Sequence, residues 1–252
     1  MAYTTSAFLL WMTGYPDRAV ERAISALELA GRLNHPFTTA YALFHVGLLD
    51  LWRGELDLVK KRASDVLVVA EEHDYQVWKA VALVLHGVAL SGLGHAEEGI
   101  EESERGVVQY QGLKTPPIFW PVLLSLRASA FALAGRSVEG METVDTALEI
   151  TGENDMLSTS LALLKGDMLA ALSDLDGARG WYRKSLEVAH AWGARMPQLQ
   201  AATRLVRLGP GGEDGQDGTE TLRSIYDTFT EGFGTHDLLD ARSLLERSSD
   251  RP

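Results

Sequence analysis

The fold is decided by the stretch Gly166-Asp-Met-Leu-Ala-Ala-Leu-Ser-Asp-Leu-Asp-Gly-Ala-Arg-Gly-Trp-Tyr-Arg-Lys-Ser-Leu186. Small and aromatic residues lie at set places around its central turn: Gly166 and Leu169 precede the turn, and Ala178 and Tyr182 follow it. Similar turns recur at steps of 40, 40, 41 and 38 residues, as Gly14-Tyr-Pro-Asp, Gly54-Glu-Leu-Asp, Gly94-His-Ala-Glu, Gly135-Arg-Ser-Val and Ser173-Asp-Leu-Asp. Self-similarity at such a period indicates a repeat protein.

Each repeat is predicted to be a helical hairpin. The segment before each turn is strongly apolar, as in Ala40 to Trp52, and suits a buried helix. After the first turn, Ala19, Ala23 and Leu27 mark one apolar face at helical spacing. Glycine provides the backbone angles that end the first helix of a hairpin, and a proline such as Pro36 is tolerated where the next hairpin begins. Because one hairpin cannot bury its apolar face alone, successive hairpins must stack around a shared core.

The residues around the turns resemble the tetratricopeptide pattern. HEAT and armadillo repeats have a similar period of about 40 to 47 residues and differ only in such residue detail. The chain departs from the tetratricopeptide pattern where Val59, Gly99 and Gly140 stand in place of the usual alanine. The sequence therefore predicts an all-α, tetratricopeptide-like α-solenoid, which is a right-handed superhelix of helix-turn-helix hairpins.

The predicted organisation has three parts. The repeats occupy residues 1–208, with turns near 14, 54, 94, 135 and 173. The glycine-rich stretch 209–218 is expected to be a flexible loop. Helical patterns from Thr219 to Thr230 and from Leu238 to Arg247 predict C-terminal capping helices, within a segment of capping helices and tail over 219–252. A stack of repeats needs such a cap, because its last hairpin otherwise exposes an apolar face.

Composition limits the function classes. The chain has 252 residues, of which 46% are apolar and 23% charged, so it can bury a substantial core. It contains no cysteine, which excludes disulfides and thiolate metal sites, and we expect a cytoplasmic protein. No apolar run approaches the roughly 18 residues of a membrane span. The net charge of −12 repels phosphate backbones and anionic lipids, so neither nucleic acid nor a membrane is expected as a direct partner.

No catalytic motif emerges from the sequence. It has no Gly-Lys-Ser/Thr phosphate loop and no His-Glu-x-x-His pair, and Gly135-Arg-Ser-Val-Glu-Gly140 is one residue too long for a nucleophile elbow. Five glutamates between Glu97 and Glu104 either contribute to a hard-cation site or form a solvated helix face. We therefore predict no catalytic residue, no metal ligand and no cofactor, and we expect that the protein is not an enzyme.

Candidate binding residues lie on the first helix of each hairpin, because these helices line the inner, concave groove of a tetratricopeptide stack. Tryptophan and tyrosine favour interfaces, since they bury a large area and keep a polar group, although ordinary packing between repeats is the alternative. Two cations near this surface could select an acidic peptide or effector, or could simply be solvated. The candidates are Tyr41, Phe44, His45, Trp52, Trp78, Lys79, His86, Trp120 and Arg127.

The C-terminal segment carries the most specific resemblance. Tyr226-Asp-Thr-Phe-Thr-Glu-Gly-Phe233, together with Gly14-Tyr-Pro-Asp-Arg-Ala19 near the start, resembles the tetratricopeptide C-terminal region of bacterial ATPases fused to class III adenylate or guanylate cyclase domains, and of related LuxR-type transcriptional regulators. The family usually continues through another turn and helix where this chain has its glycine-rich stretch, so the final repeat is expected to be degraded.

The resemblance implies a sensory or docking arm whose ATPase and cyclase modules lie upstream. The expected function is therefore a non-catalytic protein-interaction or regulatory scaffold in signalling. Its partner is expected to be a protein or peptide, or the upstream modules of its own parent protein, and the chain could also form a homo-oligomer. The alternative function is a repeat domain that senses a small-molecule effector.

Overall fold

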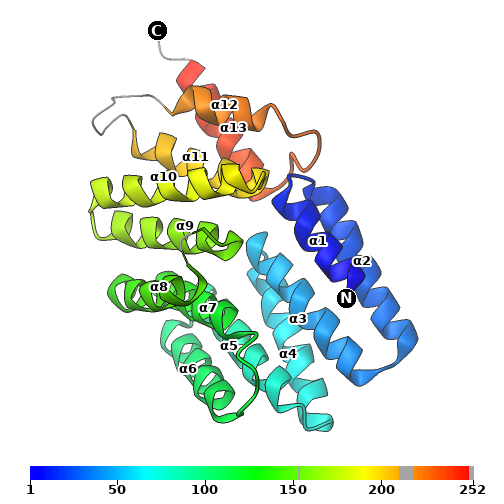
Figure 1. Ribbon diagram of the computed structural model, residues 1–252. Helices are drawn as coiled ribbons and strands as arrows, with labels where there is room; N and C mark the ends of the chain where they lie inside the picture. The colour runs from blue at the N-terminus through cyan, green and yellow to red at the C-terminus, as the bar shows by residue number, and fades with distance from the viewer. Residues whose placement is uncertain (153, 210–217, 250–252) are drawn as a thin grey trace. The chain divides into compact units, whose positions relative to one another are not determined.

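A computed structural model describes the chain except for residues 153, 210–217 and 250–252. The described residues form helices and no strand (Figure 1). The helices are α1 (Ala2–Met12), α2 (Pro16–Leu33), α3 (Pro36–Trp52), α4 (Leu56–Glu72), α5 (Gln76–Gly92), α6 (Ala96–Gly112), α7 (Trp120–Leu133), α8 (Ser137–Thr151), α9 (Met156–Ala171), α10 (Leu175–Ala191), α11 (Arg195–Leu208), α12 (Thr219–Tyr226) and α13 (His236–Ser249). The protein is all-helical with packing between consecutive helices, which is compatible with an α-solenoid. The predicted loop at 209–218 falls almost entirely outside the described residues.

One backbone arrangement ends the first helix of five hairpins. The second residue after each of these helices has a positive φ, between 68° and 94°, and is Gly14, Gly54, Gly94, Gly135 or Ser173. The N–H of the following residue donates to a carbonyl five positions earlier, as from Tyr15 to Leu10 at 2.8 Å and from Glu55 to Asp50 at 2.9 Å. This is the Schellman arrangement, which satisfies the carbonyls that a helix end leaves free. The five turns are therefore structurally equivalent, and positions in different hairpins can be compared residue by residue.

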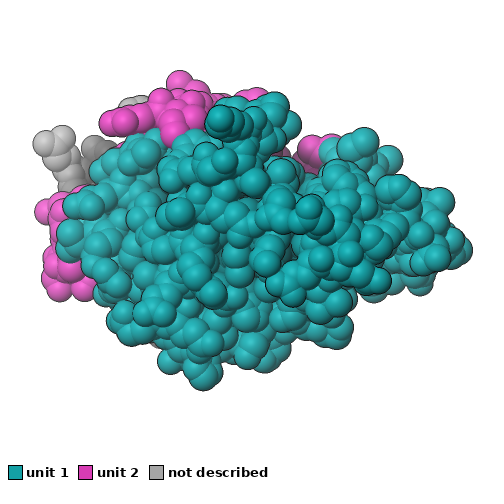
Figure 2. All heavy atoms as spheres, turned by 90° about the horizontal axis from the view of Figure 1, so that it is seen from below, with its two compact units in different colours: residues 1–8, 20–147 teal, residues 9–19, 148–252 magenta. Residues whose placement is uncertain are grey.

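The chain forms two compact units (Figure 2). Unit 1 comprises Met1–Phe8 and Val20–Ala147, and unit 2 comprises Leu9–Ala19 and Leu148–Pro252. In unit 1, α3 packs on α4, α4 on α5, α5 on α6 and α6 on α7, and α5 also packs on both α3 and α7. No α-carbon of α4 lies within 8 Å of one in α6. Successive odd-numbered helices therefore contact each other, α3 with α5 and α5 with α7, whereas α4 and α6 do not.

The core of unit 1 is densely packed. Fully buried side chains from successive helices meet in it, including Phe44, Val59, Leu85 and Leu123. Helices α5 and α6 approach so closely that a Cβ added at Gly106 would overlap the carbonyl oxygen of Ala80. Glycine inside a helix lowers helix propensity, and here it permits this close helix–helix contact.

Unit 2 contains its own core and a long-range contact. Tyr182 donates to the carboxylate of Asp167 at 2.7 Å, and Arg204 donates to both oxygens of the same carboxylate at 2.7 and 2.9 Å. The tail after α12 packs on the α1–α2 turn, where the Gly232 N–H donates to Asp17 at 2.9 Å. The two segments that carry the family resemblance therefore contact each other within this unit.

The C-terminal helical pattern was predicted to continue to Thr230, but α12 ends at Tyr226. Arg18 donates to the Glu231 carboxylate through its backbone N–H at 3.0 Å and through Nε at 2.8 Å. Phe229 is also held in the structure, since it is only 5% exposed and lies beside Gly14. Residues after Tyr226 thus make contacts with the start of the chain instead of continuing the helix.

Among the described residues, no helix combines the length and apolar character needed to cross a membrane.

Candidate functional site

Most of the aromatic candidates belong to one continuous cluster of ring contacts in unit 1. Its shortest contacts are Tyr41 with His45, whose ring centroids lie 3.9 Å apart, and Phe8 with Trp52 at 4.9 Å. Phe119 contacts the ring of Trp78 at 5.7 Å. We call this the aromatic cluster, and its members are Phe8, Phe37, Tyr41, Phe44, His45, Trp52, His73, Tyr75, Trp78 and Phe119.

The cluster forms because its residues come from successive odd-numbered helices. Phe37, Tyr41 and Phe44 recur every three or four residues along α3 and so share one helix face. Phe8 comes from α1, Trp78 from α5, and Phe119 directly precedes α7. Sequence reasoning did not name Phe8, Phe37, Tyr75 or Phe119, although an aromatic residue on or next to a first helix was the available signal.

Burial divides the aromatic cluster into a floor and an open side. Phe44 is 0% and Trp78 3% exposed, so these two members of the cluster belong to the core and form its floor. Tyr41, His45 and Trp52 are partly buried, and Phe37 is 48% exposed. Only the residues of the open side can therefore contact a partner directly, while Phe44 and Trp78 support them.

Two polar groups lie within this aromatic environment. His45 Nδ1 lies 2.7 Å from the carbonyl oxygen of Tyr41, so Nδ1 carries the proton and donates it. Burial lowers the pKa of His45 from 6.5 to about 4, so the imidazole is neutral at neutral pH. The indole N–H of Trp78 is buried without a hydrogen-bond partner. An unsatisfied buried donor is uncommon in proteins and costs stability.

The remaining candidates lie elsewhere in unit 1. Lys79 pairs with Glu71 at 2.9 Å, and Arg127 donates to Glu104 at 2.7 Å. His86 Nδ1 lies 2.7 Å from the carboxylate of Glu102, and the Trp120 ring stacks on Tyr110. None of these four joins the ring contacts of the aromatic cluster, although Trp120 packs against the same core. Lys79 and Arg127 thus each have an acidic partner within the chain.

The glutamate-rich helix α6 is less uniform than the sequence suggested. Glu102 is only 8% exposed and pairs with His86, while Glu104 pairs with Arg127. These two carboxylates therefore take part in packing between helices and do not lie on a purely solvated face. In the part of the chain that the structure describes, no group of three or more histidine, cysteine, aspartate or glutamate side chains could hold a metal ion.

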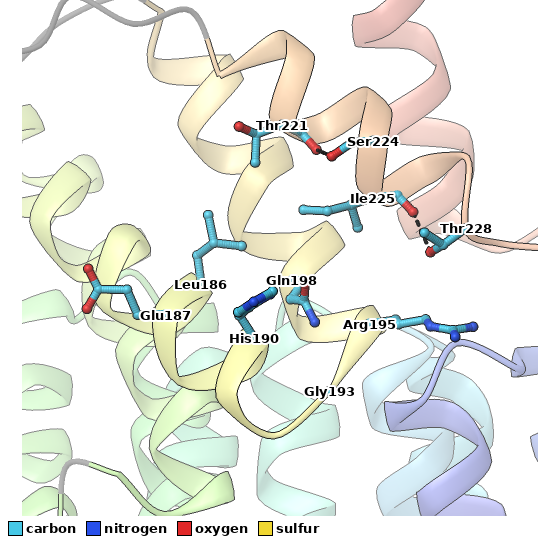
Figure 3. A pocket seen from close by; sticks show the side chains of 10 residues that line it. All are labelled: Leu186, Glu187, His190, Gly193, Arg195, Gln198, Thr221, Ser224, Ile225 and Thr228. Carbon is cyan, nitrogen blue, oxygen red and sulfur yellow. Dashed lines mark hydrogen bonds between the residues drawn. The ribbon is translucent and has the colours of Figure 1, made fainter.

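Among the described residues, cavities also lie apart from the aromatic cluster. Three of them are lined by two even-numbered helices and by the odd-numbered helix that connects these two in the chain. In unit 2, a cavity of about 660 Å³ lies between α10 and α12, with Arg195 and Gln198 of α11 between them (Figure 3). In unit 1, a cavity of about 510 Å³ lies between α6 and α8, and one of about 260 Å³ between α2 and α4. Sequence reasoning predicted none of them, because a groove between neighbouring hairpins leaves no motif.

Searches against protein-family models and curated proteins return no match to this chain. The fold and the surface geometry together define an all-helical protein with repeat-like packing and an aromatic surface on its odd-numbered helices.

Proposed function

We propose that the chain is a non-catalytic protein-interaction and regulatory scaffold of the tetratricopeptide type. Two observations support this assignment: equivalent turns join the two helices of five hairpins, and successive odd-numbered helices contact each other. In a tetratricopeptide stack the first helices of the hairpins line the groove that receives a partner. The odd-numbered helices are the first helices of this chain's hairpins.

The observation that carries the proposal is the open side of the aromatic cluster. Phe37, Tyr41 and Trp52 all come from α3 and are at least partly exposed. Exposed aromatic residues that lie over a well-packed core are typical anchors of protein interfaces. The partner is a protein or peptide that presents apolar side chains, because the open side consists mainly of aromatic rings and His45 is neutral.

We further propose that this scaffold is the sensory or docking arm of a bacterial signalling ATPase or cyclase, or of a LuxR-type regulator. Support comes from the two segments that resemble this family, since they contact each other through Asp17, Arg18, Glu231 and Gly232. The contact gives both segments a shared structural role. Partners would then include the ATPase and cyclase modules of the parent protein.

The proposal is tested by comparing two tryptophan variants in affinity purification from cells that express the protein. Trp52→Ala removes an anchor of the open side, whereas Trp192→Ala removes a tryptophan that is 52% exposed in unit 2. Trp78→Ala is unsuitable, because Trp78 is buried and its loss disturbs the core. We expect Trp52→Ala to lose specific partners that Trp192→Ala retains. Identical partner lists for both variants would contradict the proposed surface.

A further inference from the structure

A buried carboxylate lines the cavity between α2 and α4. This cavity of about 260 Å³ has mainly aliphatic walls, which include Val20, Ile24, Leu49 and Leu58. Asp50 of α3 lines it as well and is only 4% exposed. A charged group in such a setting requires a physical reason, because burying a charge is costly unless it is fully paired and hydrogen-bonded.

The equivalent positions of the other hairpins show that Asp50 is exceptional. Its carbonyl accepts the Schellman hydrogen bond from Glu55, and the residues that accept the same bond elsewhere are Leu10, Leu90, Phe131 and Leu169. Each of these four is a large apolar residue. The fold therefore does not need a carboxylate at this position, and a leucine satisfies the same backbone geometry.

The pairing of Asp50 is incomplete. Oδ1 accepts from Arg53 Nη1 at 3.0 Å, but Oδ2 has no hydrogen-bond partner and lies 3.6 Å from Arg62 Nε, which also has none. Burial raises the pKa of Asp50 even though two arginines oppose this effect. A half-satisfied buried polar pair beside a cavity is a departure from good packing, and such departures mark functional sites more often than random positions.

We propose that this cavity binds a small, mainly apolar molecule whose hydroxyl group inserts between Asp50 Oδ2 and Arg62 Nε. Neighbouring atoms cover both of these atoms in the structure, so the partly exposed Arg62 side chain moves aside as the ligand enters. A hydroxyl group donates one hydrogen bond and accepts another, so it satisfies the carboxylate oxygen and the guanidinium N–H together. The two arginines would repel a cationic ligand, and the Asp50 carboxylate would repel an anionic one. A neutral hydroxyl group can bond to both the carboxylate and the guanidinium group, while the apolar body of the ligand occupies the space between the aliphatic walls.

The size of the cavity sets the class of ligand. Pockets for drug-sized molecules usually measure about 300 to 1,000 Å³, so this cavity takes a single small alcohol or phenol. The same helix, α3, carries Tyr41 and Trp52 of the aromatic cluster and Asp50 of the cavity. The proposed binding site does not depend on the proposed protein-interaction surface. It would allow the scaffold to bind a small effector molecule through the helix that also carries this surface.

The test uses methyl NMR of the full chain, because the walls of the cavity provide methyl reporters such as Ile24, Leu49 and Leu58. The probe is p-cresol, and toluene is its matched control without a hydroxyl group. We expect saturable shifts of these methyl signals with p-cresol and roughly tenfold weaker binding of toluene, the difference that about one hydrogen bond makes.

Two variants assign the effect to the carboxylate. Asp50→Leu carries the residue of the equivalent hairpins and should fold and bind p-cresol and toluene equally. Asp50→Asn keeps a polar group and covers the case in which the leucine variant fails to fold; its preference for p-cresol should fall several-fold. Glu55→Gln, which changes an exposed acid nearby, should bind like the wild type. No methyl shift at millimolar p-cresol, equal binding of toluene by the wild type, or an unchanged preference in Asp50→Asn would each overturn the proposal.

Discussion

The neutral imidazole of His45 makes the stability of unit 1 depend on pH in a defined direction. Burial lowers the pKa of His45 from 6.5 to about 4. Above pH 6.5 the folded and unfolded chains both carry a neutral His45, so His45 does not make the free energy of unfolding depend on pH in that range. As the pH falls below 6.5, the unfolded chain binds a proton that the folded chain excludes, and the free energy of unfolding decreases until the pH approaches 4.

The expected size follows from the two pKa values. The interval from 6.5 to about 4, at 1.36 kcal/mol for each pH unit, corresponds to about 3 kcal/mol. A loss of that size is a substantial fraction of the stability of a typical domain.

The assay is urea unfolding at several pH values between 7 and 4, followed by tryptophan fluorescence, to which Trp52 and Trp78 of the same cluster as His45 contribute. His45→Phe keeps a ring but has no titratable group, so the stability of the wild type relative to this variant should fall by about 3 kcal/mol over that interval. Phe37→Leu removes a ring and no titratable group, and it should keep the wild-type pH dependence. Parallel pH profiles for the wild type and His45→Phe would refute the reasoning.

Two further predictions concern other buried features. Burial raises the pKa of Asp50 above 3.8, so the folded chain binds a proton at this carboxyl more tightly than the unfolded chain does. The free energy of unfolding of the wild type, relative to that of Asp50→Asn, should therefore fall as the pH rises from 4 to 7. Urea unfolding of both proteins at several pH values measures this difference. Gly232 has a φ of 77°, and a Cβ there would overlap Pro16, so Gly232→Ala should destabilise unit 2 by about 2 to 4 kcal/mol. Gly234 has open space where its Cβ would lie, so Gly234→Ala is the control and should change stability by less than about 1 kcal/mol. Equal melting temperatures of the two glycine variants would contradict the described packing of the tail.

The helical class was predictable because it depends on local pattern. Apolar residues at helical spacing and glycines at a step of about 40 residues indicate helices and their ends without any long-range information. The all-helical prediction is confirmed, with no strand among the described residues. The end of α12 at Tyr226 was missed, because it depends on contacts of Glu231 and Gly232 with residues more than 200 positions earlier.

The candidate surface was predictable in part. The residue type and the helix of Tyr41 and Trp52 could be inferred from the sequence, but the burial of Phe44 and Trp78 depends on how neighbouring hairpins pack. Asp50 was overlooked, although comparison with Leu90 at the equivalent position would have singled it out. A charged residue at a position where the other repeats carry a large apolar residue is therefore a sequence signal for a buried polar site.

The most direct test of the central claim places a photo-crosslinking amino acid on two surfaces of unit 1. One variant carries it at Phe37, which is 48% exposed on the open side of the aromatic cluster, and the other at Val108, which is 63% exposed on α6. After irradiation in the cells that express the protein, we expect the Phe37 variant to give a discrete crosslinked band with another protein and the Val108 variant to give none. Crosslinks of equal yield from both positions, or none from Phe37, would contradict the assignment of the aromatic cluster as the surface that binds a protein partner.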